Sequence, residues 1–440
     1  MKIVLSLALA ACSLANNACA ADLQSVYRDA VAHDAQFAAA RAALDAGREK
    51  LPQGRAGLLP TLGLGASTTW NETASTRRVN GATAATANYN SNGWTVTLTQ
   101  PIFRWQNWVA YNQAELALVI AEAQFGAARM DLVVRAAQAY FDVLLAQDTL
   151  ATAQAQKTAT AEQLESARRN FEVGTATITD SHEAQARFDL ITAQELAAQN
   201  DLTVKGHTLQ MLIGKHPEAL KRLRKGVTMT PPQPADIDRW VAMAEAGAAT
   251  VQIAQAGLEL AQREIEKQRA GHYPTLDLVA TRGNSAQTYS STVGSGIDGK
   301  ASTIGLQLSI PLFSGGAVSS KDREAVALKE KATADLDAAR RGAALAARQA
   351  YLGVTSGLSQ VRAYEAALLS SQSALDSNKL GYEVGVRINI DVLNAQTQLY
   401  DTAQKLARAR LDTLAALLKL KAAAGNLGED DVMAVNTMLE

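Results

Sequence analysis

Four stretches of the chain alternate between apolar residues and small or polar residues with a period of two. They are residues 61–70 and 94–99 in the first half, and residues 276–280 and 303–310 in the second half. Leucine, isoleucine, valine and tryptophan supply most of one face, while threonine, glycine, serine and glutamine supply most of the other. Such alternation over about ten residues is typical of a strand that faces lipid on one side. A half-buried strand of a soluble sheet is the alternative. The polar segments 73–92 and 284–301 are predicted to be the loops that join the two strands of each pair.

Long helical stretches follow the strand pairs. Residues 105–169 contain no proline and a single glycine, Gly126, and apolar residues recur at helical spacing along them. At a rise of ~1.5 Å per residue, about 65 residues give a rod of roughly 100 Å. Residues 322–379 form a second stretch of similar length. Helices this long are expected to pack on other helices as coiled coils.

The two halves of the chain are copies of one pattern. Leu-Pro-Thr-Leu at 59–62 returns as Tyr-Pro-Thr-Leu at 273–276, and Phe-Glu-Val-Gly at 171–174 returns as Tyr-Glu-Val-Gly at 382–385. Matched landmarks at a nearly constant shift of roughly 210 positions indicate tandem repeats. Each repeat is predicted to run helix, strand pair, long helix, turn, helix. The predicted parts are a signal peptide (1–20), repeat 1 (21–215), a proline-containing linker or equatorial segment (216–240), repeat 2 (241–424) and a C-terminal equatorial tail (425–440).

The first twenty residues have the organisation of a secretory signal peptide. Lys2 precedes an apolar stretch, and Ala18-Cys19-Ala20 is a small-residue cleavage site. Cleavage there removes both cysteines of the chain, Cys12 and Cys19, so no disulfide or thiol chemistry is expected afterwards. Lipidation at Cys12 is a second interpretation of this segment. Beyond residue 21 no run of 18 apolar residues occurs, so no membrane-spanning helix is predicted.

The strand count bears on assembly. Four strands cannot close a barrel, because the smallest barrels need about eight. If these strands cross a membrane, several copies of the chain must contribute to one barrel, and three copies would supply twelve strands.

Composition and motifs exclude several classes of protein. The formal net charge is -1, which gives no basic field for nucleic acid. The segment 294–299 fits the dinucleotide pattern G-x-G-x-x-G, but it lies in a predicted loop between strands and not before a helix. His182-Glu183 starts like a zinc-protease motif, yet Ala186 stands where the second histidine is required. We therefore predict no enzyme activity, no cofactor and no metal site.

Taken together, these blocks resemble the TolC family of outer-membrane channel-tunnels over nearly the whole chain after residue 21. The resemblance is carried by the segments 58–65, 99–103, 271–278, 310–316, 382–387 and 391–393 together with the internal duplication. It implies a mainly α protomer with two repeats, whose homotrimer forms a twelve-stranded membrane β-barrel and a periplasmic α-barrel of coiled coils. It also implies a passive export duct in the Gram-negative outer membrane, used in type I protein secretion, multidrug efflux or both. Its partners would be outer-membrane lipid, a periplasmic adaptor and an inner-membrane ABC or proton-driven transporter.

The resemblance further assigns roles near the turns that join paired helices. Residues expected to hold the tunnel mouth closed are Asp180, Tyr382, Arg387, Thr179 and Gln163, while Lys379 departs from the family pattern, which has an acid there. Asp391 is expected at the pore constriction, and Asn394 replaces a second acid of the family, which predicts a weaker preference for cations. Residues expected to contact the adaptor are Val173, Gly174, Thr175, Val384, Gly385 and Val386. From the residues alone, helix N-caps are the favoured interpretation of Asp180 and Asp391.

A soluble periplasmic coiled-coil adaptor is the competing functional class. An adaptor should carry one helical hairpin between two halves of a small β-domain. This sequence predicts two hairpins and two amphipathic strand pairs, which favours the duct.

Overall fold

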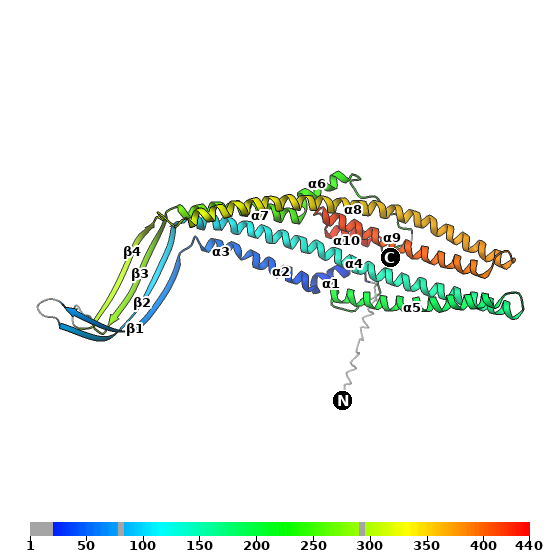
Figure 1. The fold of residues 1–440 in the computed structure, drawn as a ribbon, viewed down its shortest axis with the longest axis horizontal. Helices are drawn as coiled ribbons and strands as arrows, with labels where there is room; N and C mark the ends of the chain where they lie inside the picture. The colour runs from blue at the N-terminus through cyan, green and yellow to red at the C-terminus, as the bar shows by residue number, and fades with distance from the viewer. Residues whose placement is uncertain (1–20, 78–82, 218, 225, 290–294) are drawn as a thin grey trace, which may run out of the picture. The chain divides into compact units, whose positions relative to one another are not determined.

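The computed structural model describes residues 21–77, 83–217, 219–224, 226–289 and 295–440. The predicted signal peptide and Gly294 of the glycine motif lie outside these ranges. The elements of the described chain, labelled in Figure 1, are α1 Leu23–His33, α2 Ala35–Arg48, α3 Lys50–Ala56, β1 Thr61–Arg77, β2 Thr83–Phe103, α4 Trp105–Glu172, α5 Ile178–Ile213, α6 Ile237–Gly247, α7 Ala249–Arg269, the 3₁₀ turn η1 Ala270–His272, β3 Thr275–Gln287, β4 Ile297–Ser309, α8 Ala317–Glu383, α9 Asn389–Ala423 and α10 Glu429–Asn436. The order confirms a mainly α fold with four strands and two long helices.

The helices differ from the predicted order in one respect. Where one helix was expected before each strand pair, the chain forms α1, α2 and α3 in the first half and α6 and α7 in the second. Helix α6 begins at Ile237, inside the segment predicted as linker. None of the helices in the described ranges is long and apolar enough to cross a membrane.

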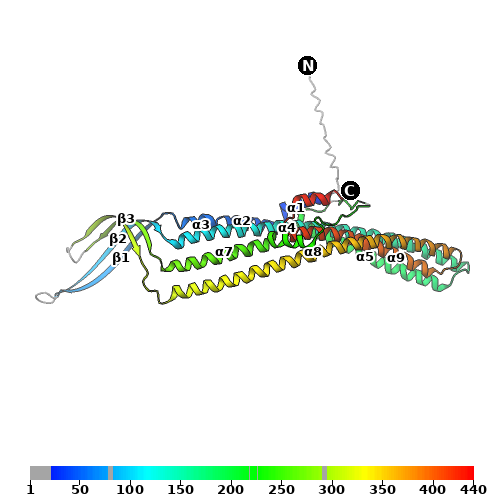
Figure 2. The same cartoon turned by 90° about the horizontal axis from the view of Figure 1, so that it is seen from above.

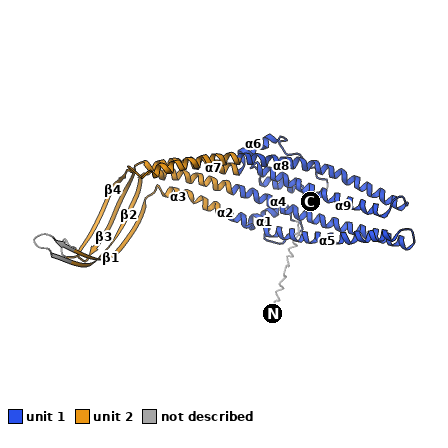
Figure 3. Ribbon diagram, in the orientation of Figure 1, with its two compact units in different colours: residues 1–41, 125–249, 340–440 blue, residues 42–124, 250–339 orange. Residues whose placement is uncertain are grey.

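The chain divides into two compact units that do not coincide with the sequence repeats (Figure 3). Unit 1 comprises residues 1–41, 125–249 and 340–440, and unit 2 comprises residues 42–124 and 250–339. Each unit therefore takes its segments from both repeats. The division falls within α2, α4, α7 and α8.

Unit 2 contains a four-stranded antiparallel sheet with the order β1-β2-β3-β4, visible from two directions in Figures 1 and 2. The two repeats meet in this sheet, because β2 of the first pairs with β3 of the second, with Val96 opposite Arg282. The strands of the first repeat are longer than the alternation predicted, at 17 and 21 residues. Residues 73–77 and 83–92, expected as part of a polar loop, belong to β1 and β2, and residues 284–287 and 297–301 of the second expected loop belong to β3 and β4. Cross-strand pairing extends strands whose sequence no longer alternates strongly.

One face of the sheet is apolar and uncovered in the protomer. Leu64 on β1 is 72% exposed and Leu306 on β4 is 68% exposed. Other large apolar residues of the same kind are Leu62, Trp70, Ile304 and Leu308, all exposed. A contiguous apolar surface of this kind on a folded chain marks a contact with another apolar phase or protein.

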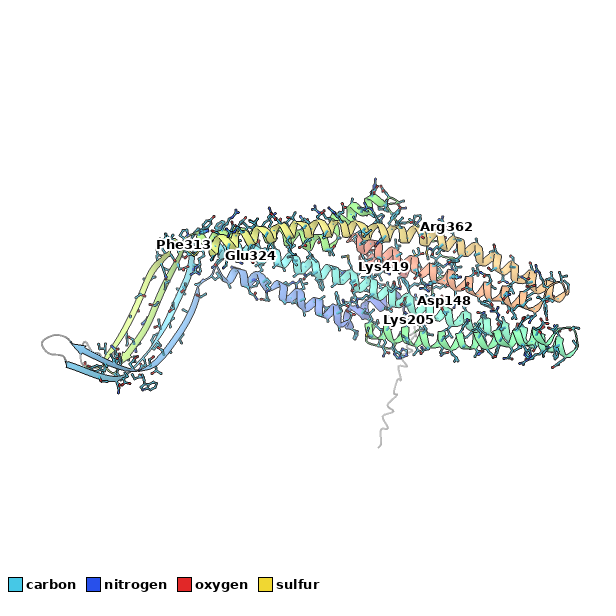
Figure 4. All side chains as sticks on the ribbon, in the orientation of Figure 1. Asp148, Lys205, Phe313, Glu324, Arg362 and Lys419 are labelled. Carbon is cyan, nitrogen blue, oxygen red and sulfur yellow. The ribbon has the colours of Figure 1, made fainter. Side chains whose placement is uncertain are left out.

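The junctions between strands and helices in unit 2 are held by a charged pair and a glycine turn. Arg104, between β2 and α4, donates from Nε and Nη2 to the two carboxylate oxygens of Asp277 on β3 at 2.8 and 2.5 Å. Asp277 is only 6% exposed, so this two-pronged pairing satisfies a buried charge. After β4, Gly315 and Gly316 have φ values of 60° and 79°, a conformation that glycine adopts without steric cost. The preceding Phe313 is 89% exposed (Figure 4).

A large hydrophobic core of unit 1 consists of buried residues from α1, α4, α5, α9 and α10, including Tyr140, Leu209 and Leu414. The backbone around Ala21 pairs with residues 219–221, and residues 222–224 pair with residues 438–440. The hydroxyl of Tyr140 donates to the carbonyl of Lys221 at 2.7 Å, which ties α4 to the segment between the repeats. Burial raises the pKa of the Tyr140 phenol well above its usual range, because ionisation would place a charge in the apolar core.

Candidate functional site: the helical tips of unit 1

Unit 1 contains two helical turns of the same construction, one in each repeat. Gly174 lies between α4 and α5 with φ 80°, and Gly385 lies between α8 and α9 with φ 76°. Each glycine donates its N–H back to the last turn of the preceding helix, to Phe171 and Tyr382 respectively. The left-handed conformation at both positions explains why the duplicated motif keeps a glycine there.

The residues predicted to contact an adaptor surround these glycines. Val173, Val384 and Val386 are 73%, 66% and 78% exposed. Thr175 is also exposed and donates its hydroxyl to the carbonyl of Asn170 at 3.0 Å. The tips thus present valines to the surroundings on a turn held by its own backbone, which makes an apolar patch available to a partner.

Three polar contacts near the tips join the hairpin of the first repeat to the hairpin of the second. Asn170 on α4 donates from Nδ2 to the hydroxyl of Tyr382 on α8 at 3.0 Å. Gln163 on α4 donates from Nε2 to Oδ1 of Asn389 on α9 at 2.5 Å. Asn389 in turn donates from Nδ2 to the backbone carbonyl of Asp180 on α5 at 3.2 Å. We call these five residues the tip cluster.

Asn389 is the centre of the tip cluster, because it contacts both α4 and α5 from the start of α9. It is 1% exposed, and burying an amide without partners costs free energy. Its two bonds satisfy one acceptor and one donor of the amide. An apolar group of Leu164, Ala167, Ala184 and Leu393 packs nearby on the same three helices. The packing of α4, α5 and α9 at this point therefore combines the hydrogen bonds of Asn389 with a small apolar core.

Asp180 is held by the start of its own helix. Thr177 is the N-cap of α5, and Asp180 at the third helical position accepts from the Thr177 backbone N–H at 2.9 Å and from its hydroxyl at 2.8 Å. The two residues form a capping box. The N-cap residues are therefore Thr177 for α5 and Ile388 for α9. The interpretation of Asp180 and Asp391 as N-caps is wrong, because both lie in the first turn of their helices, three residues after the N-cap.

Arg387 forms an ion pair with Asp391 of the same hairpin. Its Nη1 lies 3.6 Å from Oδ2 of Asp391, four residues further along. The stem of Arg387 lies against Gly381, where an added Cβ would come within 2.7 Å of Arg387 Cγ. A hydrogen bond between Asp180 and Arg387 is not among the contacts of the described residues, and Asp180 offers its carboxylate to Thr177 instead.

The remaining predicted site residues lie around this cluster. Thr179 is exposed in the first turn of α5, and Lys379 is exposed near the end of α8. Asn394, one turn beyond Asp391, is exposed and accepts from Nη2 of Arg187 on α5 at 2.8 Å. Sequence reasoning missed Asn389, Asn170 and Arg187. Asn389 could have been found in the sequence as a polar residue at a position that the helical periodicity assigns to the buried face of a coiled coil.

Comparison with known proteins agrees with this architecture. The family model described as "Outer membrane efflux protein" matches residues 26–215 and 240–426. Outer membrane protein TolC of Escherichia coli (strain K12) is 34% identical over 96% of this chain and 85% of its own length. Alkaline protease secretion protein AprF of Pseudomonas aeruginosa is 32% identical over 95% of this chain and 87% of its own length. Among solved structures, the outer membrane protein VceC of Vibrio cholerae has a TM-score of 0.76 at 22% identity, covering 92% of this chain and 96% of that one.

A helical fold with an amphipathic four-stranded sheet and two matched helical tips defines an export channel of the outer membrane. The chain belongs to the outer membrane efflux protein family, which confirms the resemblance to the TolC family. It is an outer-membrane protein with a periplasmic tunnel, and it is not an enzyme. The alternative of a soluble adaptor is not supported, because relatives and solved structures alike are outer-membrane channels.

Proposed function

We propose that three copies of this chain form one passive export duct. The observation that carries the proposal is the sheet of unit 2, which has an uncovered apolar face and two edge strands, β1 and β4. Unpaired edges are costly in lipid, because backbone N–H and C=O groups there have no water to bond. Pairing β1 of one copy with β4 of the next satisfies both edges, and three copies close twelve strands.

Exposed apolar residues on two helices of unit 1 also support assembly of several copies. On α5, Leu190, Val204 and Met211 are exposed and separated by multiples of seven residues. On α8, Leu345, Leu352 and Leu380 are exposed with the same spacing. Apolar residues at a period of seven form a coiled-coil seam, and a seam without a partner in the protomer fits a helix of another copy.

In the proposed duct the tip cluster forms part of a gate. Its contacts join the two hairpins of one protomer, so separating the hairpins requires breaking them. Asp180 and Arg387 carry charges at the same tips and are proposed to link neighbouring copies when the mouth is closed. An adaptor that binds the exposed valines at the tips would loosen these links and let the mouth open.

The gate can be tested by single-channel recording in planar bilayers. We expect Asp180→Ala with Arg387→Ser to raise conductance, because each exposed ion pair contributes ~0.2–1 kcal/mol and three-fold repetition adds the contributions. Charge reversal at both positions, Asp180→Arg with Arg387→Asp, should restore the low conductance. Thr177→Ala is the matched control, since it weakens the cap of α5 and leaves both charges in place. A double removal that keeps wild-type conductance contradicts the proposed gate.

The energy for export is proposed to come from an inner-membrane transporter, reached through a periplasmic adaptor. Two relatives are named for protease secretion, AprF of Pseudomonas aeruginosa and PrtF of Dickeya chrysanthemi, each 32% identical to this chain. A third, BepC of Brucella suis, is named an outer membrane efflux protein and is 26% identical. We propose protein export by type I secretion as the main role, with efflux of small molecules as the second candidate.

Deleting the gene for this protein in its native host distinguishes protein secretion from efflux. We expect loss of one or more secreted proteins from the culture medium with their accumulation inside the cell, and recovery on complementation. Growth in the presence of dyes, bile salts and antibiotics measures the second role in the same strains. An unchanged set of secreted proteins together with a many-fold gain in drug sensitivity would assign the duct to efflux alone.

A further inference from the structure

Arg187 is a cationic side chain placed beside the position where a second acid was expected. It lies on α5 and reaches Asn394 on α9, with Nη2 donating to Oδ1 at 2.8 Å. The two residues belong to different repeats. Arg187 is half-buried, and it lines a groove between α4, α5 and α9 together with Leu190, Leu393 and Thr160. A guanidinium has five N–H donors, and the contact with Asn394 engages one of its nitrogens.

The surroundings of Arg187 leave its charge without a carboxylate partner. Among the described residues, no aspartate or glutamate oxygen lies within 4.0 Å of its nitrogens in the protomer. The acids nearest to Arg187 in the sequence are Asp189, which accepts from Nε2 of Gln185 at 2.9 Å, and Glu183, one turn earlier on α5. On α9, Asp391 lies one turn before Asn394. Asp391 is engaged by Arg387 at 3.6 Å. Since the amide of Asn394 is neutral, it orients the guanidinium without cancelling its charge.

We propose that Arg187 sets the ion selectivity of the tunnel mouth together with Asp391, by opposing the negative charge of that residue. The inference rests on the proposed trimeric duct and on the expectation from the sequence that Asp391 and Asn394 lie at its constriction. Each copy then contributes one positive charge at the level of Asn394, one helical turn from the negative charge of Asp391. The mouth carries adjacent rings of opposite sign, so it discriminates little against anionic cargo.

The physical basis is the field of fixed charges in a narrow passage. Coulomb interactions act over the Debye length, about 10 Å at 0.1 M salt, so charges that close to the ion path affect permeating ions. Walls of low dielectric concentrate the field in a cleft lined by charge. Removing one positive charge per copy should therefore change the ratio of cation to anion permeability about three- to tenfold.

A structural role alone is the competing explanation, in which Arg187 only joins α5 to α9. The two explanations separate with a pair of substitutions. Arg187→Gln keeps an amide donor and removes the charge, whereas Arg187→Lys keeps the charge and loses the planar guanidinium. If the charge sets the selectivity, Arg187→Gln changes it and Arg187→Lys does not. If only packing matters, the two variants have similar effects.

The experiment measures reversal potentials of the reconstituted full-length protein in planar bilayers under a KCl gradient. Arg187→Gln should raise the cation preference three- to tenfold, and Arg187→Lys should stay near wild type. Asn394→Asp places an acid against the guanidinium and should shift the preference in the same direction as Arg187→Gln. Combining the two substitutions should give the largest cation preference, while Asp391→Asn should shift it the opposite way.

The outcomes distinguish failure of this inference from failure of the duct. Trimers that insert and conduct, with Arg187→Gln at the wild-type reversal potential, overturn the role of Arg187 and leave the duct intact. Arg187→Lys behaving like Arg187→Gln also overturns it, because charge would then not be the cause. A wild-type protein that forms no channels at all overturns the proposed duct and this inference with it.

Discussion

At the scale of single residues, the joint between α1 and α2 depends on one buried carboxylate. Asp34 lies between the two helices and accepts from the backbone N–H of Phe37 at 2.6 Å, which caps α2. Arg135 on α4 donates to both oxygens of Asp34, at 2.9 and 3.2 Å. The side chain of Asp34 is 9% exposed, so it needs these partners to remain charged. A single residue thus fixes both the change in helix direction and the contact with α4.

Acid should weaken this joint in a predictable range of pH. The hydrogen bond from the Arg135 guanidinium holds the pKa of Asp34 below its usual 3.8. A carboxyl with a lowered pKa in the folded state stabilises the fold above its unfolded pKa, and this contribution is lost as the pH falls through the folded pKa. We expect Asp34→Asn to cost about 1–2 kcal/mol at pH 7, and the difference from wild type to shrink below about pH 4.

Thermal unfolding of the purified wild-type and Asp34→Asn proteins at pH 7 and pH 3 measures this destabilisation and its dependence on pH. Asp45→Asn is a suitable control, because Asp45 pairs with Arg48 on an exposed surface where both side chains are more than half exposed. Such a pair should contribute little at either pH. Equal destabilisation by Asp34→Asn at both pH values would contradict the linkage to ionisation.

Contacts between distant residues explain why the structure of the helical tips was only partly predictable. Gly174 and Gly385 follow from the duplicated motif, because a left-handed turn requires glycine. The contact of Gln163 with Asn389 joins residues from different repeats, and no local pattern encodes which helix faces which. The same holds for Arg187 and Asn394. Lateral pairing of helices is set by the whole assembly of side chains, and a periodicity reports only which face is buried.

At the scale of elements, the strands combine a predictable face with an unpredictable length. Alternation identified the apolar face, and the register of β3 with β4 places Leu278 opposite Leu306 on it. The ends of β1 and β2 were predicted as loop, since residues 73–92 are polar. Hydrogen bonding between the two strands extends the hairpin there, a contribution that the alternation of single residues does not report.

The apolar face gives a test at this scale. A charge that faces lipid costs about 2–4 kcal/mol at mid-membrane for a basic residue and less for an acid. Leu306→Asp is therefore expected to lower the yield of inserted trimer, measured by membrane fractionation and gel mobility without boiling. Thr303→Asp is the matched control on the opposite face of β4, where Thr303 contacts Thr281 at 2.6 Å. Equal yields of both variants and wild type would show that this face does not meet lipid.

At the scale of the whole molecule, one chain is an incomplete structure. Its sheet has two edges, and α5 and α8 each carry exposed apolar residues separated by multiples of seven. These features have different physical origins, the first in backbone hydrogen bonds and the second in side-chain packing, and the proposed trimer would give both of them partners. In the proposed trimer the interface is head-to-tail, so β1 of each copy meets β4 of the next and never another β1.

Disulfide crosslinking tests this arrangement directly, because both cysteines of the chain precede residue 21. A cysteine on β1, Gly63→Cys, is combined in turn with Thr303→Cys, Gly305→Cys or Gln307→Cys on β4, since bridging requires Cα atoms about 4.4–6.8 Å apart. At least one combination should give crosslinked dimers and trimers after oxidation in the membrane. Gly63→Cys alone should give none, since a cyclic trimer keeps equivalent β1 strands apart, whereas a two-fold dimer joined through β1 would crosslink efficiently. A dimer from the single variant, or no crosslinked trimer from any pair, would contradict closure of the sheet by three copies.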